Sequence, residues 1–201
     1  MPAIDERSSN QKKHESRNPA QRIAIANFHN KAVELINRAR PKTILELGCG
    51  EGFVLSAVSE AGVTAELTGV DLNERAVKIA RERVGHRATI EHRDAREFID
   101  DGRRFDMVMM LEVLEHIPDP DQMLPILDRL SNGWLLLSVP WEPLFRGSNF
   151  IAGKNITRLG NDPDHCNHWG RRGFHKFIST HFDIIEMPIV FPWTMALART
   201  R

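Results

Sequence analysis

The amino-acid sequence predicts an α/β fold: a doubly wound, mostly parallel sheet of seven strands, with one antiparallel edge strand and helices on both faces. Short apolar segments alternate with amphipathic ones along the chain after about residue 21, with an interruption at 141–170. This alternation is typical of strand–helix repeats joined by right-handed crossovers. The last two apolar segments are joined only by Phe191-Pro192-Trp193. So short a connection indicates an antiparallel pair, which we place at the edge of the sheet.

Each expected strand is a short apolar segment bounded by turn residues. The segment 105–111 is mostly apolar, as a central strand of a parallel sheet should be. Strands are expected at 42–47, 66–72, 88–92, 105–111, 134–139, 184–190 and 194–200. Helices are expected at 21–40, 53–61, 74–84, 119–130 and 171–181. Asp119, Pro120 and Gln122 are the residue types of an N-cap, a first helical position and a capping-box partner.

The domain organisation follows from where the alternation begins and stops. Residues 1–20 lack periodic apolar positions, so we expect a mobile N-terminal arm. Residues 21–201 are expected to form a single domain, which is the size that one hydrophobic core supports. Within it, 141–170 combines aromatic residues, glycines and polar residues without a period. We interpret that stretch as an inserted lid.

Composition excludes several classes of function. Acidic and basic side chains number 27 each, so no overall positive field attracts a polyanion, and nucleic acid is an unlikely partner. No apolar run reaches the roughly 20 residues of a membrane span, and the first residues do not resemble a secretory signal. Two cysteines are too few for a disulfide framework. We therefore expect a cytoplasmic protein, and composition leaves its oligomeric state open.

A glycine-rich loop follows the first expected strand. Gly48, Gly50 and Gly52 allow a tight turn and close approach of the backbone to a ligand at the carboxyl end of the sheet. Asp71 ends the second strand, 21 residues after Gly50, where its carboxylate can accept from both hydroxyls of a ribose. Asp94 ends the third strand and can accept from an adenine amine. These positions predict a site for a nucleoside-containing cofactor.

Two side chains next to the loop distinguish between cofactors. Nicotinamide-binding proteins prefer G-x-G-x-x-G, and Phe53 breaks that pattern. Glu46 would repel a pyrophosphate, but it suits the cationic amino group of a methionine moiety. The pattern favours S-adenosyl-L-methionine (SAM).

These motifs resemble those of the class I SAM-dependent methyltransferases, especially the branch of the ubiquinone-biosynthesis O-methyltransferases. The resemblance rests on Glu46-Leu47-Gly48-Cys49-Gly50-Glu51-Gly52, Gly69-Val70-Asp71, Asp94-Ala95, Phe105-Asp106-Met107-Val108 and Leu111-Glu112-Val113-Leu114-Glu115-His116. It covers about residues 40–140 and implies a Rossmann-like fold, with 21–201 as the methyltransferase domain. The cofactor-binding residues that it implies are Glu46, Gly48, Cys49, Gly50, Gly52, Asp71, Leu72, Asp94, Ala95 and Leu111.

The segment after the fourth strand is a candidate metal site. If the chain is helical there, Glu112, Glu115 and His116 share one face at i, i+3 and i+4. The small-RNA 3′-terminal 2′-O-methyltransferases have a similar Glu-x-x-Glu-His, completed by a downstream His that His165 would match. Such ligands suit Mg²⁺, Mn²⁺, Zn²⁺ or Fe²⁺. In the alternative interpretation, Glu112 lines the cofactor pocket and His116 packs at a turn.

The acceptor is less well defined by the sequence. An oxygen acceptor must lose a proton, for which His116 or His165 are the candidate catalytic bases. Trp141, Phe145, Phe150 and Trp169 lie in or beside the inserted segment, and they either line an acceptor pocket or pack the lid. Basic residues of the same region (Arg146, Lys154, Arg158, Arg171, Arg172 and Lys176) either hold an acidic group of the acceptor or form a solvated face. We expect O-methylation of a small molecule; the alternatives are an RNA 2′-O-methyltransferase and a non-catalytic cofactor-binding regulatory protein.

Overall fold

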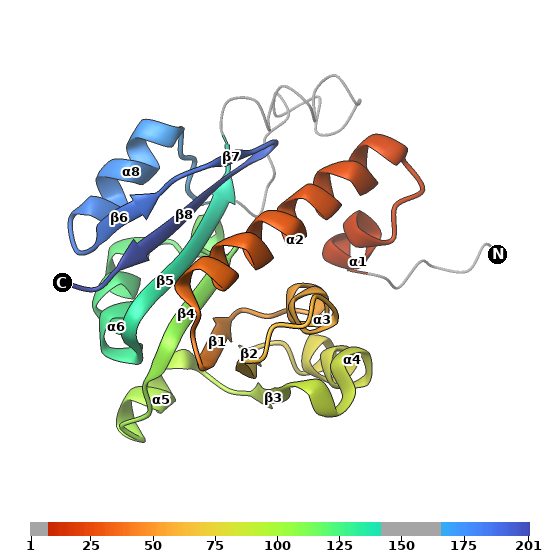
Figure 1. The fold of residues 1–201 in the computed structure, drawn as a ribbon, viewed down its shortest axis with the longest axis horizontal. Coiled ribbons are helices and arrows are strands. Elements are labelled where there is room, and N and C mark those ends of the chain that lie inside the picture. Colours follow the sequence, from red (N-terminus) through yellow and green to blue (C-terminus); the bar gives the residue numbers. More distant parts are fainter. Residues whose placement is uncertain (1–7, 142–165) are drawn as a thin grey trace.

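The computed structural model describes residues 8–141 and 166–201, and these form one open sheet flanked by helices (Figure 1). The strands are β1 Thr43–Leu47, β2 Glu66–Asp71, β3 Thr89–His92, β4 Phe105–Leu111, β5 Ser131–Pro140, β6 Asp183–Glu186, β7 Ile189–Val190 and β8 Trp193–Arg199. Within these residues the sheet has 8 strands in the order β3-β2-β1-β4-β5-β8-β6, and β7 pairs with β8. Neighbours from β3 to β5 are parallel, which confirms the predicted doubly wound α/β fold.

The antiparallel strand lies elsewhere than predicted. β8 runs antiparallel to β5 on one side and to β6 on the other, so it lies one position in from the edge. The strand predicted at 184–190 is divided into β6 and β7, which accounts for the extra strand. Pro188 lies in this break, and proline has no N–H to donate to a neighbouring strand. A shift of register in the β6–β8 pairing, between Ile184 and Glu186, precedes the break.

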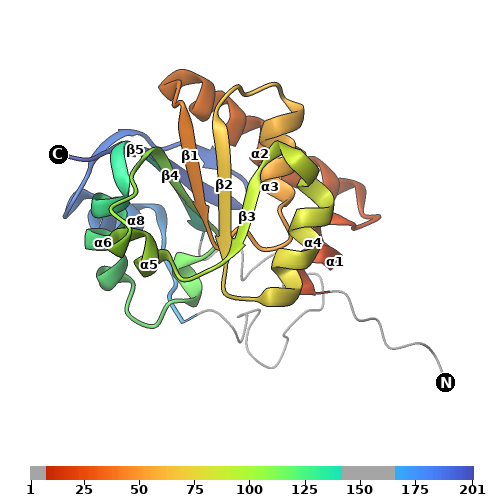
Figure 2. The same cartoon turned by 90° about the horizontal axis from the view of Figure 1, so that it is seen from below.

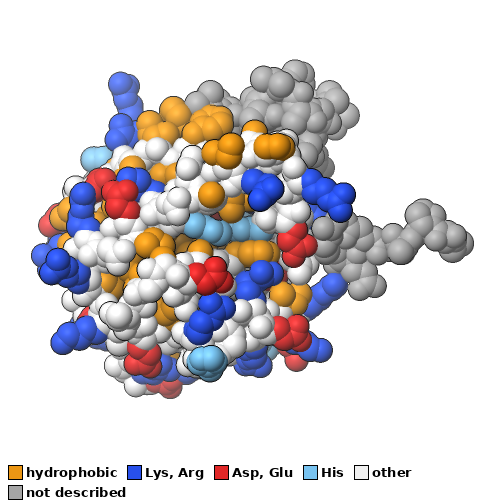
Figure 3. All heavy atoms as spheres, turned by 45° about the vertical axis from the view of Figure 1, so that its right-hand side comes forward, with side chains coloured by type: hydrophobic (Ala, Val, Ile, Leu, Met, Phe, Trp, Pro, Cys, Tyr) orange, Lys and Arg blue, Asp and Glu red, His pale blue; other side chains and the backbone are white. Residues whose placement is uncertain are grey.

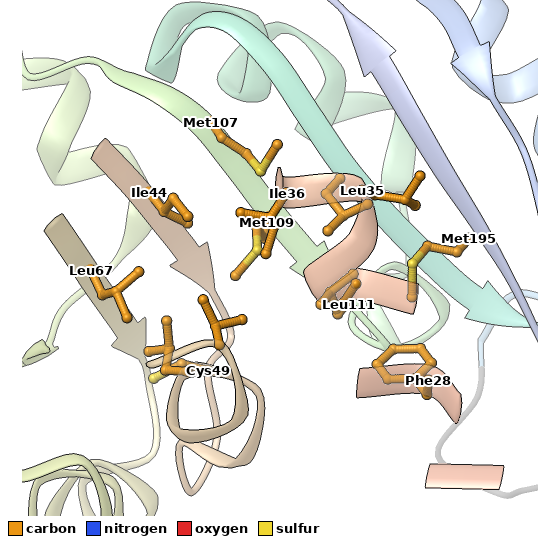
Figure 4. Close-up of a cluster of buried hydrophobic side chains, with 14 of the residues drawn as sticks. Phe28, Leu35, Ile36, Ile44, Cys49, Leu67, Met107, Met109, Leu111 and Met195 are labelled. Atoms are coloured by element: carbon orange, nitrogen blue, oxygen red, sulfur yellow. The ribbon is translucent and has the colours of Figure 1, made fainter. Parts of the chain in front are cut away.

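Helices cover both faces of the sheet, as Figures 1 and 2 show. They are α1 Ser9–His14, α2 Pro19–Ala39, α3 Phe53–Glu60, α4 Glu74–Val84, α5 Ala95–Asp100, α6 Met123–Leu130 and α8 Arg171–Ser179, with short 3₁₀ turns η1 Gly85–Arg87, η2 Leu114–His116 and η3 Pro120–Gln122. Helices α2, α3 and α4 pack on one face, and α5, α6 and α8 on the other. Along β4, Met107 and Met109 enter the first core while Val108 and Met110 enter the second, as expected for a strand buried on both faces. Figure 4 shows part of the first core.

Two local predictions need correction. The predicted capping box at Asp119 does not form: Asp119 precedes η3 without a side-chain capping bond, and Gln122 Nε2 instead donates to Asp119 Oδ2 at 2.8 Å. Helix α5 was not predicted because it is short and buries only Phe98. Its start could have been read from the sequence, since Asp94 and Glu97 form a capping box there.

Part of the N-terminal arm expected at 1–20 contains regular secondary structure. Ser9–His14 forms α1 and α2 begins at Pro19, with Asn18 as its N-cap.

The predicted lid at 141–170 falls largely on residues 142–165, which lie outside the described residues. Among the helices at 8–141 and 166–201, none combines the length and the apolar character needed to cross a bilayer.

Candidate cofactor and acceptor site

The glycine loop lies at the carboxyl end of β1 and leads into α3. Gly48, Gly50 and Gly52 have φ angles of +70°, +51° and +75°, a region that other residues rarely adopt. The amides of Gly48 and Cys49 both donate to Val70 O, at 2.8 and 3.0 Å, which ties the loop to β2. A Cβ atom on Gly48 would lie 2.6 Å from Val113 Cγ2. The loop therefore requires glycine for conformation and for space.

Asp71 connects the end of β2 to this loop. One carboxylate oxygen accepts from Gly50 N and the other from Asn73 N, both at 2.8 Å. These bonds hold the carboxylate beside the loop, where the sequence placed it. Leu72, the next residue, is 70% exposed, which is unusual for a large apolar side chain and leaves it available to cover a ligand.

Glu46 is buried below the loop with an incomplete set of partners. Its side chain is 3% exposed, and Oε2 has no hydrogen-bond partner within residues 8–141 and 166–201. Burial, reinforced by the nearby charge of Asp71, raises the pKa of Glu46 to about 8. A buried carboxyl group of this kind is suited to a cationic partner, which would supply both the hydrogen bond and the balancing charge.

Asp94 has a structural role that the sequence analysis missed. It is the N-cap of α5, with Oδ1 accepting from Arg96 N at 2.8 Å. The Arg96 guanidinium binds both carboxylate oxygens, at 2.9 and 2.5 Å, and lowers the pKa of Asp94. A ligand amine at this position would share the carboxylate with Arg96. Ala95 is the first residue of α5 and is half-buried.

Cys49 and Leu111 lie beneath the site, in the first core (Figure 4). Each side chain is 6% exposed. Burial raises the pKa of the Cys49 thiol, so it stays protonated, and a Cβ atom on Gly69 would lie 3.0 Å from its Sγ. We therefore expect these two residues to support a ligand through their backbone and their packing.

The α-helix that would place Glu112, Glu115 and His116 on one face is absent. Glu112 has a left-handed φ of 60°, and the chain then forms the short 3₁₀ turn η2, so no α-helical face presents the three side chains together. Glu115 is 1% exposed and its Oε2 has no partner among the described residues, whereas His116 is exposed. Burial, with the nearby Glu112, raises the pKa of Glu115 well above its usual value. His165 lies outside the described residues.

Glu112 has partners of its own. Its Oε1 accepts from Ser138 Oγ at 3.0 Å, and its Oε2 lies 3.7 Å from Lys13 Nζ. Burial raises the pKa of Glu112, and the positive charge of Lys13 opposes that rise. Within 8–141 and 166–201, no group of three His, Cys, Asp or Glu side chains is arranged to hold a metal ion.

Helix α1 is the main element beside the candidate site that sequence reasoning missed. Ser8 Oγ and Asn10 Nδ2 donate to the two carboxylate oxygens of Glu51, each at 2.5 Å, which places α1 against the glycine loop. His14 stacks on Phe53, with 4.0 Å between ring centroids, and burial lowers the pKa of His14 to about 3. The sequence contained one signal for this helix: Ser8 and Gln11 form a capping box.

Some of the aromatic and basic residues expected near an acceptor are described by the structure, and the others lie outside the described residues. Trp169 packs on Phe174 and Phe177, with centroid distances of 6.0 and 5.4 Å, which supports its interpretation as a packing residue. Trp141 is half-buried, and its backbone N–H donates to Pro192 O at 2.9 Å. Phe145, Phe150, Arg146, Lys154 and Arg158 lie outside the described residues. On the face in Figure 3, Lys and Arg side chains are interspersed with Asp and Glu side chains.

Solved structures share this fold. A magnesium protoporphyrin IX methyltransferase from Synechocystis, determined with bound SAH (S-adenosylhomocysteine), superimposes with a TM-score of 0.69 at 20% identity, covering 92% of this chain and 88% of that chain. A plantazolicin methyltransferase in complex with a triazolic desmethylPZN analog and SAH gives a TM-score of 0.66 at 17% identity, covering 95% of this chain and 94% of that chain.

Curated proteins are similar over a shorter stretch. A ubiquinone biosynthesis O-methyltransferase of Aromatoleum aromaticum is 39% identical over 83 residues, which is 39% of this chain and 35% of that protein. The corresponding protein of Thiobacillus denitrificans is 36% identical over 103 residues, 48% and 44% of the two chains. The matched region thus spans less than half the length of these relatives. A family model described as a methyltransferase domain matches residues 20–180, most of the chain. The chain therefore belongs to the methyltransferase domain family.

Proposed function

We propose that the protein is a SAM-dependent methyltransferase that methylates an oxygen of a small molecule. The observation that carries the proposal is Glu46, a buried carboxyl group beside a glycine loop, whose Oε2 has no partner among the residues that the structure describes. The amino group of the methionine moiety is a cation that fits this position. The names of the ubiquinone-pathway relatives support oxygen as the methylated atom. The equal numbers of acidic and basic side chains, 27 each, support a small acceptor over a nucleic acid.

Each residue around the loop would contact a different part of SAM. Glu46 would pair with its amino group, Asp71 would accept from the ribose hydroxyls, and Asp94 from the adenine amine. The exposed side chain of Leu72 would cover the adenine ring and lose contact with water on binding. Gly48, Gly50 and Gly52 would let the backbone approach without a Cβ in the way.

When bound, SAM supplies a methyl group already activated by its sulfonium. The protein then has to orient the acceptor oxygen in line with that methyl group, exclude water and accept a proton. His116 is the base that we propose: it lies on the turn after β4, and it interacts electrostatically with Glu112. His165, the second candidate base, stays a prediction from the sequence.

The cofactor assignment has a direct test. SAM and its demethylated product SAH should raise the melting temperature of the purified protein, whereas NAD at the same concentration should leave it unchanged, because only a ligand that binds the native state stabilises it. Thermal unfolding followed by fluorescence measures this. A mass-spectrometric screen of metabolites with isotope-labelled SAM then identifies the acceptor. Equal stabilisation by NAD would rule out the proposal.

A divalent metal is not part of the proposed mechanism, because the described residues do not fit one. The carboxylate of Glu112 is engaged by Ser138 and the Lys13 ammonium, Glu115 is buried, and the expected helical face is absent. We expect turnover, followed as labelled methyl transfer, to be the same in excess chelator as in its absence. Loss of turnover in chelator, restored by one divalent ion, would contradict this and return His165 to the ligand set.

A further inference from the structure

Lys13 brings a positive charge from α1 to the carboxyl end of β4. Its Nζ lies 3.7 Å from Glu112 Oε2 and 4.6 Å from the centre of the Trp193 ring. The distance to Glu112 is longer than a hydrogen bond, so this contact neutralises charge without using the N–H donors of the ammonium. An ammonium held in this way can still donate to a ligand.

The position of Lys13 is fixed from both sides. On α1, Ser8 and Asn10 are bonded to Glu51, so the helix is held against the glycine loop. At β4, Glu112 adopts a left-handed backbone that is costly for a residue with a side chain, and Ser138 holds its carboxylate. Strain of this kind persists where the surroundings impose it, which is common at functional sites.

The pair also borders the proposed cofactor site. Val113, the residue after Glu112, packs so closely on the loop that a Cβ atom on Gly48 would lie 2.6 Å from it. The acceptor oxygen has to lie next to the methyl group of the cofactor, and Lys13 and Glu112 are on this side of the loop. The titratable groups that interact with one or both of these residues are His14, His29, Glu115 and His116.

We propose that Lys13 binds the acceptor oxygen and stabilises it as an anion, with Glu112 as the positioning residue that holds Lys13. The inference rests on the proposed methyltransferase function and adds a substrate preference: an acceptor whose methylated oxygen belongs to an acidic O–H group.

The acceptor O–H loses its proton to a base or to water. A lone pair of the oxygen then forms the bond to the methyl carbon, the carbon–sulfur bond breaks, and its electrons remain on sulfur as a neutral thioether. The lysine stays an ammonium throughout.

The test uses 4-nitrophenol, a small acidic phenol with a coloured anion, and the full-length protein saturated with SAH. We expect the wild type to bind it as the anion and to lower its pKa by about 1, as a cation within a few ångströms does. Lys13→Met should abolish this shift and weaken binding of the anion about tenfold. Lys13→Arg, which keeps the charge, should retain most of the shift. Lys12→Met is the matched control on the exposed side of the same helix and should behave as the wild type.

Calorimetric titration of SAH into each variant separates the two proposals. One possible result is that SAH binds all variants equally and that the Lys13→Met protein lowers the pKa of bound 4-nitrophenol as much as the wild type does. This result would refute the role of Lys13 and leave the proposed function standing. Failure of SAH-loaded wild type to bind the 4-nitrophenol anion refutes the role of Lys13 as well. Failure of the wild type to bind SAH refutes the proposed function, and the inference about Lys13 with it.

Discussion

Glu46→Gln should weaken the binding of SAH about ten- to hundredfold, which corresponds to about 1.5–3 kcal/mol for a hydrogen bond between charged groups. In the free protein at neutral pH, burial keeps the Glu46 carboxyl mostly protonated, because its pKa is about 8. Pairing with the amino group of the ligand requires the ionised form, so the wild type should release a proton on binding below about pH 8. The glutamine variant should release none from this site. Calorimetry in buffers of different ionisation enthalpy measures both the affinity and the number of protons released on binding.

Adenosine is the matched control ligand, because it has no amino-acid part. Its affinity should be the same for the wild type and for Glu46→Gln. A loss of adenosine binding in the variant would show that Glu46 maintains the shape of the loop and does not recognise the amino group. In that case the main support for a methionine-containing cofactor would be lost.

Glu46→Gln, which should weaken ligand binding, should increase the stability of the ligand-free protein at high pH. The pKa of Glu46 is raised from 4.5 in the unfolded chain to about 8 in the native state, so the native state binds the proton more tightly. The stability of the ligand-free wild type should therefore fall as the pH rises from about 4.5 through 8. Glu46→Gln removes this loss and should be the more stable protein at pH 9. Urea unfolding at pH 6 and pH 9 checks the direction.

Asp71→Ala should also weaken SAH binding, by about 1–3 kcal/mol, which is about five- to 150-fold. The variant loses the proposed bonds to the ribose and also the two acceptors that hold Gly50 N and Asn73 N at 2.8 Å. Because those amides fix the loop, unfolding free energy should fall as well. Calorimetric titration and urea unfolding measure the two effects on the same sample.

Asp106→Ala is the control for the structural part of this effect. Asp106 also accepts from two backbone amides, Lys42 N at 2.8 Å and Thr43 N at 3.3 Å, but these lie at the start of β1, at the opposite end of the sheet. We expect a similar loss of stability with unchanged SAH affinity. If Asp106→Ala lowered the affinity as much as Asp71→Ala, the loss would reflect general destabilisation of the sheet.

The sequence by itself determined the parallel core and the frame of the proposed cofactor site. Every strand of the described residues overlaps a predicted range, with β6 and β7 sharing one, because an apolar segment between turn residues is a local pattern. Gly48, Gly50 and Gly52 were identifiable because left-handed backbone strongly favours glycine. Asp71 followed from its place at a strand end, since parallel strands bring their carboxyl ends to one edge.

Tertiary structure alone decided the features that depend on distant contacts. Ser8 and Glu51 are 43 positions apart, and nothing near either residue predicts that they meet. The same holds for Lys13 beside Glu112, and for β8 between β5 and β6, because the order of strands depends on how whole elements pack. Burial is equally non-local: it leaves Glu115 and Glu46 at 1% and 3% exposure and raises the pKa of both carboxyl groups. Sequence patterns show which side chains can bind or react, whereas their desolvation and their partners are set only when remote segments pack together.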